Sequence, residues 1–148
     1  MKVTLDASVW LSANSPAERR YDECAELLTA LVQRKTAIHQ PALFVIEVCA
    51  TIARRTGDRA LALQAGRLAL SMPHLEVHAM THRAAANATD VAATCRLRGA
   101  DAVYVATARD AGSTLITLDR ELRERGTELA RVLSPAEWKA LSRSDPQA

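Results

Sequence analysis

The sequence predicts a single α/β domain built on a mostly parallel sheet that is flanked by helices. Short apolar runs alternate with longer segments of helical periodicity, which is the pattern of strands joined by helical crossovers. The chain has 148 residues, the usual size of one domain. Its composition, with 49% hydrophobic and 24% charged residues, is that of a folded globular domain and excludes a disordered chain.

Two strands and two helices are expected in the first 57 residues. The first strand is the short run 2–5. Ser15-Pro16-Ala17-Glu18 has the pattern of a capping box with proline at the first helical position, which predicts a helix from Ser15 to about Leu31. A short strand follows at 37–39, and a second helix extends from Pro41 to Gly57.

The middle of the chain continues the alternation of helix and strand. The expected elements are a helix from 58 to about 72, a strand at 75–78, and helices over 81–97 and 100–111. Asp58 is a good N-cap for the first of these helices. Gly99 and Gly112 are expected to end the other two, because glycine adopts the left-handed conformation that closes many helices.

The last part of the chain is expected to add two strands and two helices. These elements are a strand at 114–118, a short helix at 119–125, an edge strand at 131–133 and a final helix that begins near 134. Ser134-Pro135-Ala136-Glu137 repeats the capping-box pattern. We therefore expect one domain over residues 1–142 and a frayed tail over 143–148.

The cysteines and the hydropathy of the chain favour a cytoplasmic protein. The three cysteines are far apart and include no CxxC pair, so we expect the reduced thiols Cys24, Cys49 and Cys95. Asp6 interrupts the N-terminal segment before a signal peptide could form. The most apolar stretch, 42–53, is shorter than the roughly 20 residues that cross a bilayer, so no membrane segment is expected.

Two aspartates directly follow predicted strands. Asp6 comes after the strand 2–5, and Asp119 comes after the strand 114–118. Ligands of open α/β sheets bind outside the carboxyl ends of the parallel strands, so both carboxylates are expected at the same sheet edge. The alternative for each is a purely structural N-cap where a strand turns into a helix.

Two further acidic residues lie on predicted helices. Glu47 shares one stripe of its helix with Thr51, Arg54 and Arg55. This stripe is either a narrow solvent face with an ion pair or the lining of a cleft, and the rest of the helix is apolar enough to predict that it is mostly buried. Asp101 lies at the start of the helix 100–111, where a negative charge is also favourable by itself.

If these four carboxylates gather at one edge, they require a counter-charge. Carboxylates within a few ångströms repel one another strongly. A hard divalent cation removes that repulsion, and Mg²⁺ or Mn²⁺ suits a site whose ligands are all oxygen. The residues therefore predict a candidate acidic metal site, at which a bound ion would activate water and stabilise charge on a phosphoryl group.

The acidic positions stand within segments that resemble the four signature blocks of PIN-domain nucleases, and among these the VapC-type toxins of toxin–antitoxin pairs. The resemblance covers the chain from Lys2 to about Trp138. The matching segments are Val3-Thr4-Leu5-Asp6-Ala7-Ser8, Glu47 on its helix, Gly99-Ala100-Asp101-Ala102-Val103-Tyr104-Val105-Ala106 and Leu115-Ile116-Thr117-Leu118-Asp119. The resemblance implies an α/β/α sandwich and a Mg²⁺- or Mn²⁺-dependent endoribonuclease.

The resemblance also implies roles for single residues. Asp6 and Asp101 match the main metal ligands of the family, and Glu47 and Asp119 match two acidic positions that bind metal directly or through water. It further implies a homodimer and an antitoxin, VapB-like, that lays a peptide into the active-site groove.

Four other residues are expected to support this site. Ser8 and Thr117 match hydroxyl residues that orient the metal-binding carboxylates. Arg54 and Arg55 are candidate contacts to the RNA backbone, although a solvated helix face explains them equally well. The net charge of +2 provides no strong attraction to nucleic acid, but without the four proposed ligands 19 basic residues face 13 acidic ones.

Two other functions are compatible with an α/β fold. One is a PIN-fold module that binds RNA or protein without cleaving it. The other is a receiver-like signalling domain, which would need a second acidic residue beside Asp6, where Ala7 stands, and a lysine at the end of a late strand. Both are separated from a nuclease by a test for metal-dependent RNA cleavage.

Neither the histidines nor the aromatic residues are expected to form a functional site. His74, His78 and His82 are spaced for one face of a helix, but Pro73 and the predicted strand 75–78 argue against a helix there, so no histidine metal site is expected. Five aromatic residues are too few for a protein that binds nucleic acid by base stacking.

Overall fold

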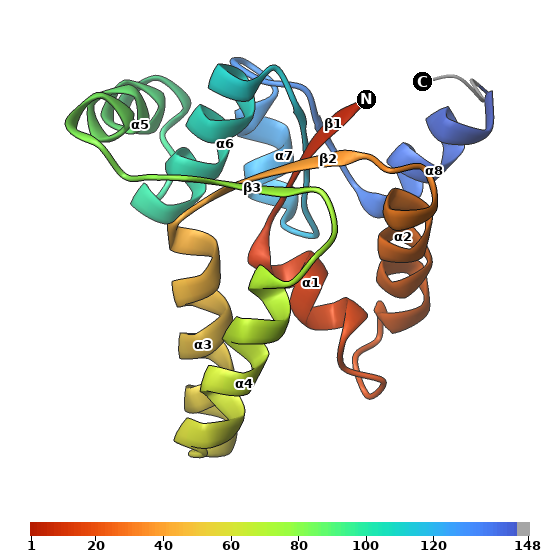
Figure 1. Ribbon diagram of the computed structural model, residues 1–148. Coiled ribbons are helices and arrows are strands. Elements are labelled where there is room, and N and C mark those ends of the chain that lie inside the picture. The colour runs from red at the N-terminus through yellow and green to blue at the C-terminus, as the bar shows by residue number, and fades with distance from the viewer. Residues whose placement is uncertain (145–148) are drawn as a thin grey trace.

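The computed structural model describes residues 1–144, and these form a parallel sheet with helices on both faces (Figure 1). The strands are β1 (Lys2–Leu5), β2 (Ala37–Pro41), β3 (Leu75–His78), β4 (Thr114–Ile116) and β5 (Val132–Leu133). Their order is β3-β2-β1-β4-β5, and every neighbouring pair is parallel. The predicted α/β/α architecture is confirmed.

The connections between the strands are helical. The helices are α1 (Ala7–Ala13), α2 (Tyr21–Gln33), α3 (Leu43–Thr56), α4 (Arg59–Leu70), α5 (His82–Cys95), α6 (Gly99–Ala111), α7 (Arg120–Gly126) and α8 (Pro135–Ser144). The order of the strands reverses direction after β3, so that β4 pairs with the other side of β1. This reversal places the carboxyl ends of β1 and β4 side by side, which is where ligands of such sheets bind.

Alternating strand residues supply two cores, one on each face of the sheet. Val3 and Leu5 of β1 face a core shared with α2 and α8, where Leu31 and Trp138 are buried. Leu115 of β4 belongs to the opposite core, formed mainly with α5 and α6. A sheet that is buried on both faces is typical of parallel strands joined by helices.

Several helix starts follow the predicted capping chemistry. Asp58 accepts a hydrogen bond from the backbone N–H of Leu61 at 3.0 Å. Ser134 and Glu137 form a reciprocal capping box, in which the Glu137 N–H donates to Ser134 Oγ at 3.2 Å and the Ser134 N–H donates to Glu137 Oε2 at 2.7 Å. These caps satisfy backbone donors that a helix leaves unpaired at its N-terminus.

Two predicted helix ends are wrong. The capping box at Ser15 does not form: α2 begins at Tyr21, and the Glu18 carboxylate instead pairs with Arg55 of α3 at 2.6 Å. Helix α5 ends at Cys95 and is closed by Arg96, which adopts a left-handed φ of 54°, and Gly99 starts α6. The Arg96 carbonyl accepts a hydrogen bond from Arg125 Nη1 at 2.6 Å, a contact between distant parts of the chain that supports this turn.

Helices α3 and α4 form a pair that projects away from the sheet (Figure 1). The prediction that α3 is mostly buried is wrong. Only Phe44 and Val48 of this helix are buried, and Ile46 is 60% exposed. Its partner α4 approaches closely at Gly66, where a Cβ atom would collide with Cys49 Sγ of α3.

The structure tests the predicted thiols fully and the predicted C-terminal tail only up to residue 144. Helix α8 continues to Ser144, and the predicted frayed tail otherwise lies at 145–148, outside the described residues. Cys24 and Cys95 are buried, Cys49 is half-buried, and all three are free thiols. Among the helices described here, none has the length and apolar character needed to cross a membrane.

Candidate active site

Asp6 stands where β1 leaves the sheet, but its carboxylate does not cap α1. Its backbone N–H still donates to the Ile116 carbonyl of β4 at 2.9 Å, which ties this corner to the sheet. The carboxylate Oδ2 instead accepts hydrogen bonds from Ser8 Oγ at 2.5 Å and from Thr117 Oγ1 at 2.8 Å. The purely structural explanation of Asp6 as an N-cap therefore fails, and two hydroxyls hold its carboxylate in one orientation.

Thr117 links the ends of β1 and β4. Its side chain is fully buried, and its Oγ1 both donates to Asp6 Oδ2 and accepts from the Asp119 N–H at 2.9 Å. The parallel pairing of Leu5 with Ile116 brings these residues together across 111 positions of sequence. One hydroxyl therefore positions the two aspartates that follow neighbouring strands.

Asp119 does act as an N-cap. Its Oδ1 accepts a hydrogen bond from the Leu122 N–H at 3.1 Å at the start of α7. A carboxylate has two oxygens and about four lone-pair sites, so one capping hydrogen bond leaves Oδ2 able to bind a ligand. The structural and the functional explanation of Asp119 are thus compatible.

Glu47 on α3 has a partner that the sequence did not predict. Tyr104 of α6 is 1% exposed, and its hydroxyl donates a hydrogen bond to Glu47 Oε2 at 2.5 Å. Burial raises the pKa of Glu47; the Tyr104 hydrogen bond opposes this rise and the charge of Asp6 adds to it. Burial and the Glu47 hydrogen bond also raise the pKa of Tyr104, so its hydroxyl stays protonated and acts as a donor.

Asp101, in the first turn of α6, experiences the charges of all three other acidic residues. Burial first, then the charges of Asp6 and Asp119, raise its pKa to about 6; Arg98 opposes this and Glu47 adds a smaller contribution. Such coupling requires the four carboxylates to lie near one another. The structure therefore brings the predicted acidic residues to the same sheet edge.

The four carboxylates are nevertheless more widely spaced than a preformed cage. Among residues 1–144, the one group of three histidine, cysteine or acidic side chains whose donor atoms all lie within 4.8 Å of one another is His39, Glu76 and His78. An acidic set at wider spacing fits a hard ion such as Mg²⁺, which keeps several of its own water ligands. The donor atoms are all carboxylate oxygens that repel one another, and this chemistry also fits a divalent cation.

A depression beside Asp6 contains part of the predicted helix stripe. Glu47, Thr51 and Arg55 line it together with Asp6 and Ser8. The stripe therefore borders the acidic edge, as the cleft interpretation required. Arg55, at the basic end of the stripe, already forms an ion pair, since its Nη1 lies 2.6 Å from Glu18 Oε1.

Arg54 differs from its neighbour. It is exposed and does not line the depression that Arg55 borders. A contact between Arg54 and RNA therefore stays a prediction.

Sequence reasoning missed two features of this part of the molecule. Tyr104 lies three residues after Asp101, so helical spacing places both on a similar side of α6 and could have identified it. His39, Glu76 and His78 come together only through the register of β2 and β3, in which His39 is directly opposite Glu76. That register cannot be read from either strand alone.

Comparisons with known proteins identify the family and the fold. A family model of the PIN domain matches residues 3–128. A VapBC2 structure from Rickettsia felis, bound to a promoter DNA fragment, superposes with a TM-score of 0.70 at 12% identity and covers 90% of this chain and 98% of that one. FitAcB from Neisseria gonorrhoeae also has a TM-score of 0.70, at 18% identity and with the same coverage of both chains.

A third solved structure is a single toxin. VapC20 from Mycobacterium tuberculosis, described as cleaving the sarcin–ricin loop, has a TM-score of 0.68 at 20% identity, covering 83% of this chain and 94% of that one. A search of curated proteins returned no match. At these identities the solved structures establish a shared fold.

Proposed function

Since this chain is a member of the PIN domain family, we propose that it is a Mg²⁺- or Mn²⁺-dependent endoribonuclease and the toxin of a VapBC-type pair. The observation that carries the proposal is the gathering of four carboxylates at one sheet edge. Thr117 joins Asp6 to Asp119, and Asp6 and Glu47 line the same depression. Asp101 is close enough to these three for their charges to raise its pKa. A fold alone would not require these charges to meet, because folds host many functions. Their repulsion is a cost that a bound cation would remove.

Asp6 and Asp101 would hold the ion, with Glu47 and Asp119 binding it directly or through water. When bound, such an ion lowers the pKa of a coordinated water and stabilises negative charge on the phosphoryl group. Ser8 and Thr117 donate to one oxygen of Asp6 and leave the other for the cation. Tyr104 fixes Glu47 in the same manner, so three hydroxyls orient two of the four carboxylates.

The substrate would reach this edge along the depression that Glu47, Thr51 and Arg55 line. Arg54, on the same helix, is exposed but does not line this depression, and Arg55 is held by Glu18. Arginine forms planar, paired hydrogen bonds to phosphate, so both side chains suit contacts to the RNA backbone. Binding through Arg55 would exchange Glu18 for a phosphate.

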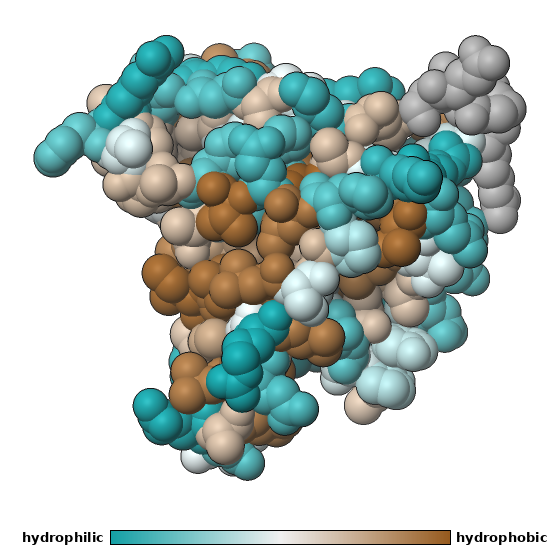
Figure 2. All heavy atoms as spheres, viewed as in Figure 1, coloured by the Kyte–Doolittle hydropathy of each residue, from teal (hydrophilic) through white to brown (hydrophobic). Residues whose placement is uncertain are grey.

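Protein partners are proposed on two grounds. Toxin–antitoxin complexes, among them one from Klebsiella pneumoniae at 21% identity, share the fold. Apolar side chains also gather on the surface over β3 and the α3–α4 pair (Figure 2). Ile46, Leu68, Leu70, Val77 and Met80 are each at least 45% exposed. Contiguous exposed apolar surface is typical of protein interfaces, so we propose an antitoxin and a second copy of this chain as its partners.

The decisive experiment incubates the purified protein, free of any antitoxin, with mixed cellular RNA. We expect cleavage in Mg²⁺ or Mn²⁺, none in EDTA, and a loss of at least about 100-fold for Asp6→Ala and Asp101→Asn, because each removes a carboxylate that would hold the ion. Asp22→Asn, an exposed acidic residue in the first turn of α2, is the matched control and should cleave normally. Metal-dependent RNA binding without cleavage by the unaltered protein would favour the non-catalytic module instead.

A further inference from the structure

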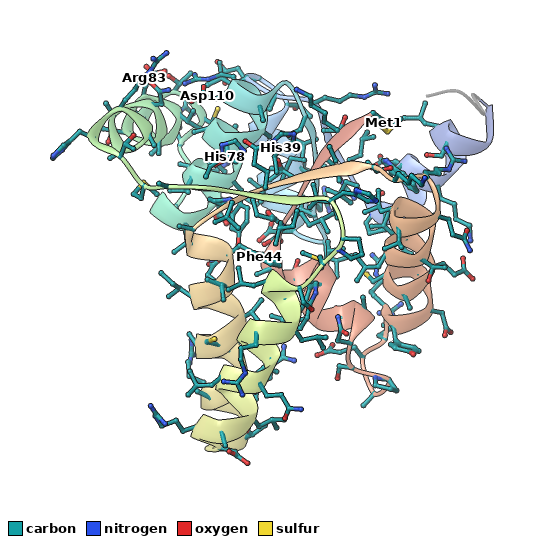
Figure 3. All side chains as sticks on the ribbon, in the orientation of Figure 1. Met1, His39, Phe44, His78, Arg83 and Asp110 are labelled. Atoms are coloured by element: carbon teal, nitrogen blue, oxygen red, sulfur yellow. The ribbon has the colours of Figure 1, made fainter. Side chains whose placement is uncertain are left out.

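A second cluster of metal-binding side chains lies on β2 and β3, outside the acidic site. His39 Nδ1 is 3.0 Å from His78 Nε2, and the Glu76 carboxylate reaches both rings, with Oε2 3.5 Å from His39 Nδ1 and Oε1 3.6 Å from His78 Nε2. The two rings lie on the side of the strands where α6 is found (Figure 3). None of the residues assigned to the acidic site belongs to this group.

The β-sheet register explains why these three side chains meet. His39 pairs with Glu76 across neighbouring strands, and His78 is two positions further along β3. Residues directly opposite one another, and residues two apart on one strand, project from the same face of a sheet. The positions are therefore set by backbone pairing and do not depend on flexible loops.

The separations of the donor atoms match those of a tetrahedral metal centre. Zn²⁺ binds histidine nitrogen and carboxylate oxygen at about 2.0–2.1 Å, so two ligands of a tetrahedral ion lie roughly 3.3–3.4 Å apart. The observed separations of 3.0, 3.5 and 3.6 Å bracket that value. Two neutral imidazoles and one carboxylate also leave one coordination position open, as in zinc sites that bind a water molecule.

The environment favours the protonation states that a metal needs. His39 is 7% exposed, and burial, the largest influence, lowers its pKa, which keeps the imidazole neutral near physiological pH. The other titratable groups acting on it are Glu76, which opposes this decrease, and His78 and Lys2, which add to it. A neutral imidazole is the form that coordinates metal.

The cluster is accessible from solvent on one side. The side chain of His78 is 35% exposed and that of Glu76 is 64% exposed. His78 also borders a hollow of about 460 Å³ that Thr81 and Asp110 line as well. An ion can therefore enter from this side while His39 anchors the site from within the protein.

We propose that His39, Glu76 and His78 form a binding site for a borderline transition-metal ion such as Zn²⁺, separate from the acidic site for Mg²⁺ or Mn²⁺. Nitrogen ligands select Zn²⁺, Co²⁺ or Ni²⁺ over the hard ions that prefer oxygen. A bound ion joins the edge strand β3 to β2, and this stabilises the folded chain because the unfolded chain does not present the three ligands together.

The test uses tag-free, full-length protein that has been stripped of metal. We expect one Zn²⁺ per chain by isothermal titration calorimetry, a rise in melting temperature with Zn²⁺, and visible absorption bands of a tetrahedral ion when Co²⁺ is added. His78→Gln and Glu76→Gln should each weaken Zn²⁺ binding by roughly 100-fold, at least as much as the loss of an orienting residue around a metal. Both positions are partly exposed, so their metal-free melting temperatures report whether they fold.

Two kinds of control variant make the result specific. His82→Gln and His74→Asn change exposed histidines outside the cluster and should keep the binding. Asp6→Asn and Asp101→Asn alter the acidic site and should also keep it, so failure of the nuclease proposal would not affect this one. Absence of Zn²⁺ and Co²⁺ binding, or binding that survives His78→Gln but is lost in Asp101→Asn, would overturn the proposal.

Discussion

Asp101 makes the metal-free protein less stable as the pH rises, and Asp101→Asn should reverse this effect. Its folded-state pKa is about 6, against an ordinary value of 3.8. The native state therefore holds a proton that the unfolded state releases between these two pH values. The stability that this proton provides is complete below about pH 4 and is lost as the pH rises through about 6.

The size of the effect follows from the pKa difference. About two pKa units correspond to about 3 kcal/mol of destabilisation at pH 7.5. Asp101→Asn removes this cost, but it also removes a favourable negative charge from the first turn of α6, worth up to about 1 kcal/mol. We therefore expect the variant to be about 2 kcal/mol more stable than the unaltered protein at pH 7.5 in EDTA.

The measurement is urea denaturation in EDTA at pH values from 4 to 7.5. The gain of Asp101→Asn should appear at the upper end and shrink towards pH 4, where the aspartate is protonated in the folded state and about half protonated in the unfolded state. Asp22→Asn loses a similar helix-terminal charge at an exposed position outside the acidic edge, and should show no comparable gain at pH 7.5. Equal or lower stability of Asp101→Asn at pH 7.5 would refute the raised pKa of Asp101.

Two further predictions concern stability. Thr117→Val should destabilise the protein by about 2–4 kcal/mol in urea denaturation, because it removes a donor to the Asp6 carboxylate and leaves the Asp119 N–H without its acceptor. Thr117→Ser keeps the hydroxyl and should lose much less stability. Equal losses of stability in the two variants would contradict the role of that hydroxyl. Gly66→Ala should destabilise by about 1–3 kcal/mol, since its Cβ would collide with Cys49 Sγ. Adding Cys49→Ala should restore most of that loss, and no restoration would show that the contact is unimportant.

The strand and helix pattern was predictable because it depends on local chemistry. Leu75–His78 forms a strand and Asp58 caps a helix, as their neighbours in sequence indicate. The error at Ser15 has the opposite origin. Glu18 could either complete a capping box or pair with a distant cation, and the pairing with Arg55 is a tertiary contact that no local pattern contains.

The same distinction separates the two candidate metal sites. The acidic residues at the ends of β1 and β4 were predictable, because parallel strands bring their carboxyl ends to one edge whatever the details of packing. The cluster of His39, Glu76 and His78 was not, since the spacing of the histidines along the chain pointed to a helix. Its formation depends on which residue of β2 pairs with which residue of β3.

The sequence by itself determined the order of the strands along the chain, most of the helices, the family and the four acidic positions, because periodicity, caps and signature blocks are local. It missed the short helix α1 (Ala7–Ala13) that directly follows Asp6. Only the tertiary structure decided how those residues are held. Thr117 bridges two strand ends and Tyr104 holds Glu47, through hydrogen bonds that span 111 and 57 positions of the chain. Such contacts depend on strand register and helix packing, which are set by the free energy of the whole fold and not by any one segment.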